Sequence, residues 1–242
     1  MGVGAAYGRP DDAQSAYLVR VDGRAVCLDL GAGTLNRLAG MVAPEALEAV
    51  VISHVHPDHC ADLLALRVYM AWGPGRGRRV RVLGPAGLRE RLIAFSGPEG
   101  WDEGILFEVL DEPRGRLDLG GGLVLTYAEV PHLPPTFALR LDHGDRSICF
   151  GADCAPNDAL VELASGCGVL LAECSFGAMA VPEGVPHLNA IDAGVIAGKA
   201  RATHLLLTHC YPELDRDQAL AAALEAAGIA TGWATPGVAV AA

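Results

Sequence analysis

The six residues His54-Val55-His56-Pro57-Asp58-His59 decide how this sequence is interpreted. They follow a continuous apolar run at 49–53, which predicts a strand buried on both faces. Imidazole and carboxylate groups are the ligands that zinc takes at catalytic sites. A loop at the end of this strand directs His54 and His56 together, and the next turn offers Asp58 and His59 from another direction. Two adjacent groups of ligands predict two metal ions that share one pocket.

Further ligands must come from other parts of the chain, because each catalytic metal normally takes three or four protein ligands. His132, Asp153 and His209 each follow a predicted strand, at the end where a pocket forms. A single histidine in such a place is more often structural. The shared placement of the three residues, together with the histidine-rich segment, favours a role as ligands. We do not expect His143, in a hairpin turn, or His204, at the start of a strand, to bind metal.

The remaining pattern predicts an α/β protein with two sheets and one domain over residues 1–242. Asp22-Gly23 joins the strands 16–21 and 25–30 in a hairpin, and a second hairpin turns at 143–144. Strands are also expected at 80–83, 105–110, 123–130, 169–173 and 203–209. Helices are expected at about 60–71, at 87–95, after the N-cap Asn189, and in a segment that ends at Gly228.

These motifs together resemble the metallo-β-lactamase superfamily, from about Tyr17 to Pro212. The segments VLGPAGL (82–88), LLAECSF (170–176), HLNAIDAGVIAGKA (187–200) and LLLTHCYP (205–212) resemble its ribonuclease-Z-like branch. The resemblance implies an αββα four-layer sandwich that binds two Zn²⁺ ions, with Mn²⁺ or Fe as alternatives. It implies one metal on His54, His56 and His132, a second on Asp58, His59 and His209, and Asp153 as the bridge.

The resemblance also implies a mechanism. A hydroxide that bridges two zinc ions is a nucleophile near neutral pH, because the cations lower the pKa of the water. His187 resembles the loop histidine that gives a proton to the leaving group, and Glu173 resembles the acidic residue that orients it. Asp58 is expected to serve in catalysis as well as in metal binding. The sequence therefore predicts a phosphodiesterase that acts on small-molecule or nucleotide substrates.

Three alternative enzymes use the same fold. The first is a ribonuclease Z that processes transfer RNA. In that enzyme the residue before the glutamate that corresponds to Glu173 is usually His, but this chain has Ala172 there. Such enzymes also carry a long basic arm after the Gly-Pro segment, and this chain has no room for one after Gly84-Pro85. The second is a lactone or thioester hydrolase, which would not need His187. The third is a di-iron redox protein, which usually has Glu where this chain has His56. A non-catalytic metal-binding or interaction protein is the remaining alternative, and the complete set of ligands argues against it.

Composition sets further limits. The formal net charge is −11 over 242 residues, which disfavours RNA held along an extended surface but not a small phosphodiester at the metals. The sequence shows neither a membrane-spanning apolar run nor a signal peptide, so we expect a cytoplasmic protein that does not bind membranes. The resemblance implies a homodimer. The resemblance implies a full strand before the Gly-rich turn, but here Met1 is followed at once by Gly2-Val3-Gly4, so either the first strand is truncated or the start codon is misassigned. The Arg-rich segment 76–81 is either an anion contact or a solvated loop.

Overall fold

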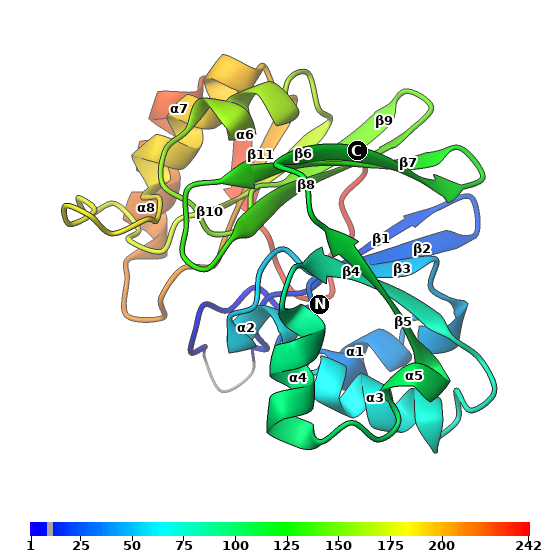
Figure 1. Cartoon of the computed structure of the whole chain (residues 1–242). Helices are drawn as coiled ribbons and strands as arrows, with labels where there is room; N and C mark the ends of the chain where they lie inside the picture. Colours follow the sequence, from blue (N-terminus) through cyan, green and yellow to red (C-terminus); the bar gives the residue numbers. More distant parts are fainter. Residues whose placement is uncertain (9–11) are drawn as a thin grey trace. The chain divides into compact units, whose positions relative to one another are not determined.

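Two β-sheets organise the chain, and the computed structural model describes residues 1–8 and 12–242. Each sheet belongs to a separate compact unit. The first unit comprises Met1–Gly2 and Ala13–Glu112, and the second comprises Val3–Asp12 and Pro113–Ala242. In Figure 1 the strands of the first unit run from blue to green, and those of the second run from green to red. The predicted α/β class with two sheets is confirmed, and the extent of one domain over 1–242 stays a prediction.

The sheet of the first unit has five strands in the order β1-β2-β3-β4-β5. A hairpin starts it, and its turn residues Asp22 (φ +48°) and Gly23 (φ +80°) both have the left-handed backbone of the predicted turn. The next three strands add in parallel, which requires crossovers through helices. The strands are β1 (Tyr17–Val21), β2 (Arg24–Leu28), β3 (Ala49–Val51), β4 (Val80–Pro85) and β5 (Ile105–Leu110).

Short helices connect these strands and cover an apolar cluster that includes Leu38, Leu63 and Trp101. The helix expected at 60–71 is two helices, because the amide of Asp62 bonds to the carbonyl of Leu30 and leaves the helical ladder. The carboxylate of Asp62 accepts from the amides of Thr34 and Leu35, at the start of the helix Leu35–Ala39. The helices are α1 (Leu35–Ala39), η1 (Pro44–Ala46), α2 (Pro57–Cys60), α3 (Leu63–Ala71), α4 (Leu88–Ser96) and α5 (Trp101–Gly104).

The sheet of the second unit has seven strands in the order β12-β11-β10-β9-β8-β7-β6. The antiparallel part is a meander, and the strands from β9 to β12 pair in parallel. The sequence did not predict β6 or β12, which form the two edges. The strands are β6 (Arg114–Gly120), β7 (Leu123–Val130), β8 (Thr136–His143), β9 (Arg146–Phe150), β10 (Val169–Glu173), β11 (His204–Thr208) and β12 (Ala230–Trp233).

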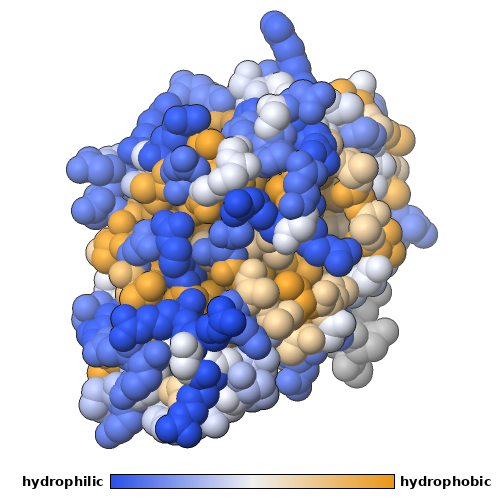
Figure 2. Space-filling model, turned by 90° about the vertical axis from the view of Figure 1, so that its right-hand side faces the viewer, coloured by the Kyte–Doolittle hydropathy of each residue, from blue (hydrophilic) through white to orange (hydrophobic). Residues whose placement is uncertain are grey.

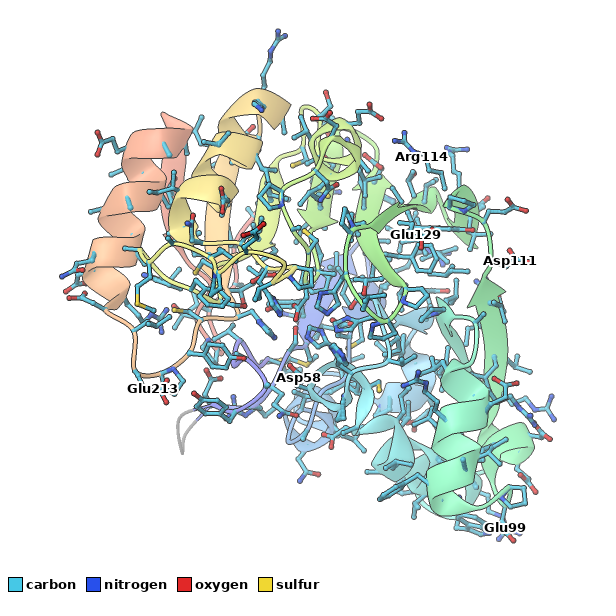
Figure 3. The ribbon with its side chains drawn as sticks, turned by 60° about the vertical axis from the view of Figure 1, so that its left-hand side comes forward. Asp58, Glu99, Asp111, Arg114, Glu129 and Glu213 are labelled. Atoms are coloured by element: carbon cyan, nitrogen blue, oxygen red, sulfur yellow. The ribbon has the colours of Figure 1, made fainter. Side chains whose placement is uncertain are left out.

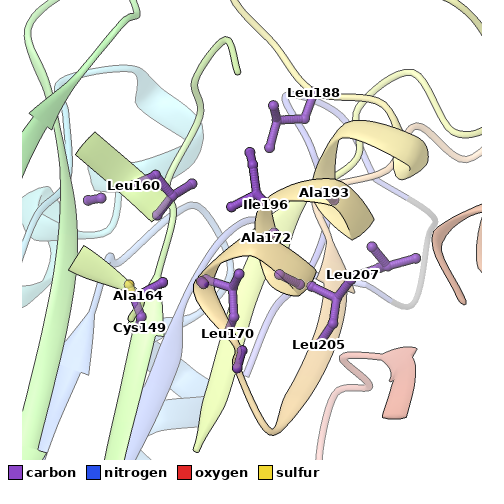
Figure 4. Packing of buried hydrophobic residues seen from close by; sticks show 14 of the residues in the cluster. Cys149, Leu160, Ala164, Leu170, Ala172, Leu188, Ala193, Ile196, Leu205 and Leu207 are labelled. Atoms are coloured by element: carbon purple, nitrogen blue, oxygen red, sulfur yellow. The ribbon is translucent and has the colours of Figure 1, made fainter. Parts of the chain in front are cut away.

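Three helices pack on this sheet: α6 (Asp158–Leu163), α7 (Ala190–Ala200) and α8 (Arg216–Ala227). Figure 4 shows the apolar cluster between helix and sheet, to which Ile196 of α7 contributes together with Leu170 of β10 and Leu205 of β11. Helices α7 and α8 approach closely at Gly194. A Cβ there would lie only 2.6 Å from the carbonyl of Ala223, so the approach requires glycine at this position. This packing holds the start of α7, and the loop before it, against the sheet.

The first residues of the chain are paired with the edge of the first sheet. Gly2 forms an isolated antiparallel bridge with Ala16, and the amino group of Met1 donates to the carbonyl of Ala16 at 2.9 Å.

The described surface carries apolar side chains on several elements, such as Phe95 (81% exposed) and Trp72 (57%) in the first unit and Leu133 (80%) in the second. On the face drawn in Figure 2, hydrophilic residues lie between the apolar ones. Within residues 1–8 and 12–242, no helix has both the length and the apolar character needed to cross a bilayer.

Candidate functional site

The histidine-rich segment follows β3, as the sequence predicts, and it enters the short helix α2 where the sequence predicts a turn. His56 is the N-cap of this helix and Pro57 is its first residue, so the backbone turns directly after the strand. Asp58, which Figure 3 labels, lies in the first turn of α2. His54, Asp58 and His59 are buried, and His56 is half-buried. Burial of this many polar groups in one short segment indicates a built site rather than a solvated turn.

The four side chains of this segment face one another. His54 Nε2 lies 3.0 Å from His56 Nδ1, and His59 Nε2 lies 3.4 Å from Asp58 Oδ2. The rings of His54 and His59 are 4.1 Å apart between centroids. Three imidazoles and one carboxylate therefore converge within the first unit, with donor atoms that suit a divalent metal ion.

Asp29, directly after β2, is a member of this site that the sequence analysis missed. Its Oδ2 lies 2.6 Å from His59 Nδ1 and accepts from Ser53 Oγ at 3.0 Å, while its Oδ1 accepts from the Ser53 amide at 2.7 Å. The side chain is fully buried, which raises the pKa of its carboxyl above the usual value. A lone carboxylate within the apolar run AVCLDLG is the sequence signal that could have identified it.

In the second unit, the predicted residues follow neighbouring parallel strands. Asp153 comes after β9, Glu173 ends β10 and His209 comes after β11. Because the carboxyl ends of parallel strands meet at one edge of a sheet, the three side chains lie together. His209 Nε2 is 3.5 Å from Asp153 Oδ2, and both side chains are buried. His209 has a left-handed backbone (φ +53°), which directs its side chain at the expense of local strain.

His132 and His187 complete this group from two loops. His132 lies in the loop after β7 and its Nδ1 is 3.1 Å from the carbonyl of Pro186. Burial lowers the pKa of His132, which favours the neutral ring that binds metal. His132, Asp153 and His187 each offer a ligand atom, and these atoms lie within 4.8 Å of one another. His187 Nδ1 is also 3.9 Å from Asp153 Oδ2.

Glu173 contacts His187 directly, as the sequence predicts. Its Oε1 lies 2.8 Å from His187 Nδ1 and accepts from the Cys154 amide at 3.0 Å. Its Oε2 accepts from the amide of Ser175 at 3.1 Å and from the hydroxyl of the same residue. Sequence reasoning missed Ser175, whose Oγ lies 3.1 Å from His209 Nδ1. A buried glutamate with this many donors is held as a fixed acceptor.

The structure thus brings the predicted ligands together in two groups, one within each unit. The first group holds His54, His56, Asp58 and His59, and the second holds His132, Asp153 and His209, with the predicted proton donor His187 beside them. Both consist of imidazole and carboxylate donors and could hold a metal ion. How the seven predicted ligands divide between two metals stays a prediction.

Two cysteines next to these residues, Cys60 and Cys154, have raised thiol pKa values. Burial raises the pKa of Cys60 to about 12, and it also raises the pKa of Cys154 well above the usual value. The thiol of Cys60 donates to the carbonyl of His56. Since metals bind the thiolate, these contacts favour a structural role for both residues.

The Arg-rich segment divides into exposed and paired side chains. Arg76, Arg78 and Arg79 are exposed in the loop before β4. Arg81 makes a two-point ion pair with Glu108 on the adjacent strand, at 2.6 and 2.8 Å. These positions match the interpretation of the segment as a solvated loop and strand.

Comparison with known proteins shows where similar chains occur. A family model described as the beta-lactamase superfamily domain matches residues 28–210. An uncharacterized protein of Mycobacterium tuberculosis is 33% identical over 222 residues, which cover 88% of this chain and 80% of the relative. A ribonuclease Z of Mycobacterium marinum is 27% identical over 252 residues, with coverage of 92% and 90%.

A solved structure also matches nearly the whole chain. The metallo-beta-lactamase fold protein YhfI of Bacillus subtilis has a TM-score of 0.88 and 25% identity, and the match covers 98% of this chain and 95% of the other. In sequence, the same protein is named a probable metallo-hydrolase and is 29% identical over 201 residues, with coverage of 82% and 80%. The fold class predicted from the sequence is confirmed.

Proposed function

The chain is a metal-dependent hydrolase of the beta-lactamase superfamily, and on that premise we propose that it hydrolyses phosphodiesters in small-molecule or nucleotide substrates. The observation that carries this proposal is the contact of His187 with Glu173 at 2.8 Å. A phosphodiester needs a proton for its leaving alkoxide, and an imidazole held by a buried carboxylate is suited to supply it.

The position of His187 supports this role. Its side chain is 20% exposed, whereas those of Asp153 and Glu173 are 4% and 1% exposed. A group that exchanges protons with substrate and solvent must be reachable, and a group that only orients it need not be. Glu173 holds the ring through Nδ1, so Nε2 is the atom that would donate to the leaving oxygen.

We propose that the chain binds two Zn²⁺ ions, with Mn²⁺ or Fe as alternatives. The proposed ligands are those named from the sequence: one metal on His54, His56 and His132, the other on Asp58, His59 and His209, with Asp153 shared. The observed donor sets fit such ions, because all of them are imidazoles and carboxylates in buried or half-buried positions. When bound, divalent cations lower the pKa of a water molecule and stabilise negative charge on phosphoryl oxygens.

The ribonuclease Z alternative rests on the relative from Mycobacterium marinum, which is named so. The resemblance to transfer-RNA processing enzymes implies a basic arm after Gly84-Pro85, a stretch that runs here from Pro85 to Ile105. It contains only α4, α5 and their connecting loops. We therefore propose a small substrate rather than transfer RNA. A cytoplasmic location and a homodimer also remain proposals.

The test compares substrates that differ in their leaving group. Purified zinc-loaded protein is assayed with bis(p-nitrophenyl) phosphate, a dinucleotide with an alkoxide leaving group, a transfer-RNA precursor, a lactone and a thioester. We expect turnover of both small phosphodiesters and little cleavage of the precursor. Activity confined to the lactone or thioester would reject the proposal.

The His187→Ala variant tests the role of the histidine. It should lower kcat for the dinucleotide by about 10²- to 10⁴-fold, because loss of a general acid has this effect. The loss should be smaller for bis(p-nitrophenyl) phosphate, whose phenolate leaves without a proton. His204→Ala removes an exposed histidine of β11 and should change neither rate. Equal losses on both substrates would contradict the assignment of His187 as the acid.

A further inference from the structure

We infer that Ser53 and Ser175 are positioning residues that set the tautomers of two proposed metal ligands, His54 and His209. The inference rests on the proposed ligand roles and goes beyond them, because neither serine is itself a ligand. In each unit, a serine hydroxyl contacts a buried carboxylate and the imidazole of a proposed ligand, and Ser175 Oγ also lies 3.5 Å from His187 Nδ1.

In the second unit, the carboxylate is Glu173. Ser175 Oγ donates its single proton to Glu173 Oε2, and the same oxygen lies 3.1 Å from His209 Nδ1. The carbonyl of His209 is another acceptor, at 3.2 Å, but the contact with the Glu173 carboxylate is shorter. With its proton committed, the hydroxyl can only accept from His209, so Nδ1 carries the hydrogen. The lone pair of His209 then lies on Nε2, the atom that faces Asp153 at 3.5 Å.

In the first unit, Asp29 is the carboxylate that accepts from the serine, as Glu173 does in the second. Ser53 Oγ donates to Asp29 Oδ2 at 3.0 Å and lies 3.0 Å from His54 Nδ1. The same reasoning puts the hydrogen of His54 on Nδ1 and its lone pair on Nε2, which faces His56 at 3.0 Å. Ser53 is fully buried, so no exposed water competes for these contacts.

Each carboxylate also acts directly on a second imidazole. Asp29 contacts His59 Nδ1 at 2.6 Å, and Glu173 contacts His187 Nδ1 at 2.8 Å. The two units therefore share one arrangement, in which a buried carboxylate sets one histidine by contact and another through a serine. Such outer contacts fix ring orientation and raise the basicity of the ligand nitrogen. The shared arrangement argues that the serines belong to the site and are not incidental core residues.

The direct test measures tautomers in metal-free protein. Long-range proton–nitrogen correlation spectra of isotope-labelled protein, recorded above the pH range in which imidazole titrates, distinguish hydrogen on Nδ1 from hydrogen on Nε2. Single His→Gln variants assign the signals. We expect Nδ1–H for His54 and His209. Ser175→Ala should shift His209 towards a mixture and leave His54 unchanged, and Ser53→Ala should do the reverse.

Zinc affinity, measured by competition with a chromophoric chelator, gives the second readout. Each Ser→Ala variant should bind Zn²⁺ about 10- to 100-fold more weakly, as expected for loss of an outer contact to a ligand. Each Ser→Thr variant retains the hydroxyl and should restore the Nδ1–H tautomer. Ser147→Ala is the matched control: this buried serine of β9 accepts from the Gly168 amide at 3.1 Å, so its loss should affect stability but neither readout.

The results separate the inference from the proposed function. Hydrogen on Nε2 of His209 or His54 in the unaltered protein, or no change of tautomer and zinc affinity in the Ser→Ala variants, would overturn the inference. If a variant does not fold, as judged by its thermal unfolding, the tautomer of the unaltered protein still decides. The spectra need neither metal nor substrate, so absence of phosphodiesterase activity would reject the proposed function alone.

Discussion

His59 Nδ1 lies 2.6 Å from Asp29 Oδ2, and both side chains are fully buried. The two residues are 30 positions apart, and the contact joins the end of β2 to α2. Asp29 adopts a left-handed backbone (φ +57°), which costs about 1–2 kcal/mol for a residue with a side chain. The contacts of Asp29 with His59 and Ser53 offset this cost and the cost of burying the carboxylate.

Replacing Asp29 by Asn should damage both stability and metal binding. The amide has the same size, but its NH₂ group would face a donor from Ser53 or His59, so one buried group loses its partner. We expect a loss of about 1–3 kcal/mol in the free energy of unfolding, and a 10- to 100-fold loss in zinc affinity. Urea unfolding and chelator competition measure the two effects. Asp145→Asn changes an exposed carboxylate in a turn and is the control; equal behaviour of the two variants would contradict this role.

Removal of metal should lower both activity and thermal stability. Buried imidazole and carboxylate donors bind a divalent ion only in the folded chain, so the ion stabilises that state. At a free zinc concentration 100 times the Kd, one bound ion stabilises the folded state by about 2.7 kcal/mol. Dialysis against a chelator should therefore lower the Tm and abolish phosphodiester hydrolysis, and added zinc should restore both. Elemental analysis should find two metals per chain; protein without bound metal that retains full activity would refute the prediction.

The N-cap of α7 should matter for His187 as well as for stability. Asn189 lies two residues after His187, and its side chain accepts from the Asp192 amide at 2.9 Å. Asn189→Ala should cost about 1 kcal/mol and also lower kcat for the dinucleotide, since it loosens the loop that carries His187.

Asp215→Ala is the control for this variant. Asp215 caps α8 by accepting from the Asp217 and Gln218 amides, both at 3.0 Å, so its loss should cost similar stability. Because α8 carries none of the proposed catalytic residues, kcat should not change. A similar loss of kcat in both variants would indicate a general effect of stability.

The ion pair of Arg81 and Glu108 should make a small, pH-dependent contribution to the free energy of unfolding. The hydrogen bond from Arg81 lowers the pKa of Glu108 below its usual value. The carboxylate therefore stabilises the folded chain above its unfolded pKa, and this is lost as the pH falls through the lower folded pKa. The Glu108 side chain is 39% exposed, so solvent screening limits the contribution to under about 1 kcal/mol.

Urea unfolding of Glu108→Gln checks this sign. The variant should be less stable than the unaltered protein at neutral pH, and the difference should shrink as the pH falls below about 4. Glu103→Gln, an exposed carboxylate of α5, should show no such difference at either pH. A difference between Glu108→Gln and the unaltered protein that grows on acidification would contradict the assignment.

Some elements escaped prediction because their local pattern is weak. Strand β6 reads RGRLDLG, and its charged residues and glycines hide the alternation of an edge strand that pairs with β7. Strand β12 has four residues and ends the other edge. Helix α6 did carry a signal, because Asn157 accepts from the Leu160 amide as an N-cap, but the helix has only six residues.

The sequence by itself determined the chemistry of the candidate site. The segment from His54 to His59 is local, and His132, Asp153 and His209 follow strands whose apolar pattern is plain, so hydropathy and spacing were sufficient to name them as candidate ligands. Ser53 and Ser175 could not be named in this way, and Asp29 carried only the signal of a lone carboxylate in an apolar run. Their roles arise from hydrogen bonds to residues brought near by strand pairing, such as His59 for Asp29 and His209 for Ser175. Only the tertiary structure decides those contacts, because a buried carboxylate or hydroxyl is tolerated only where other segments supply its partners.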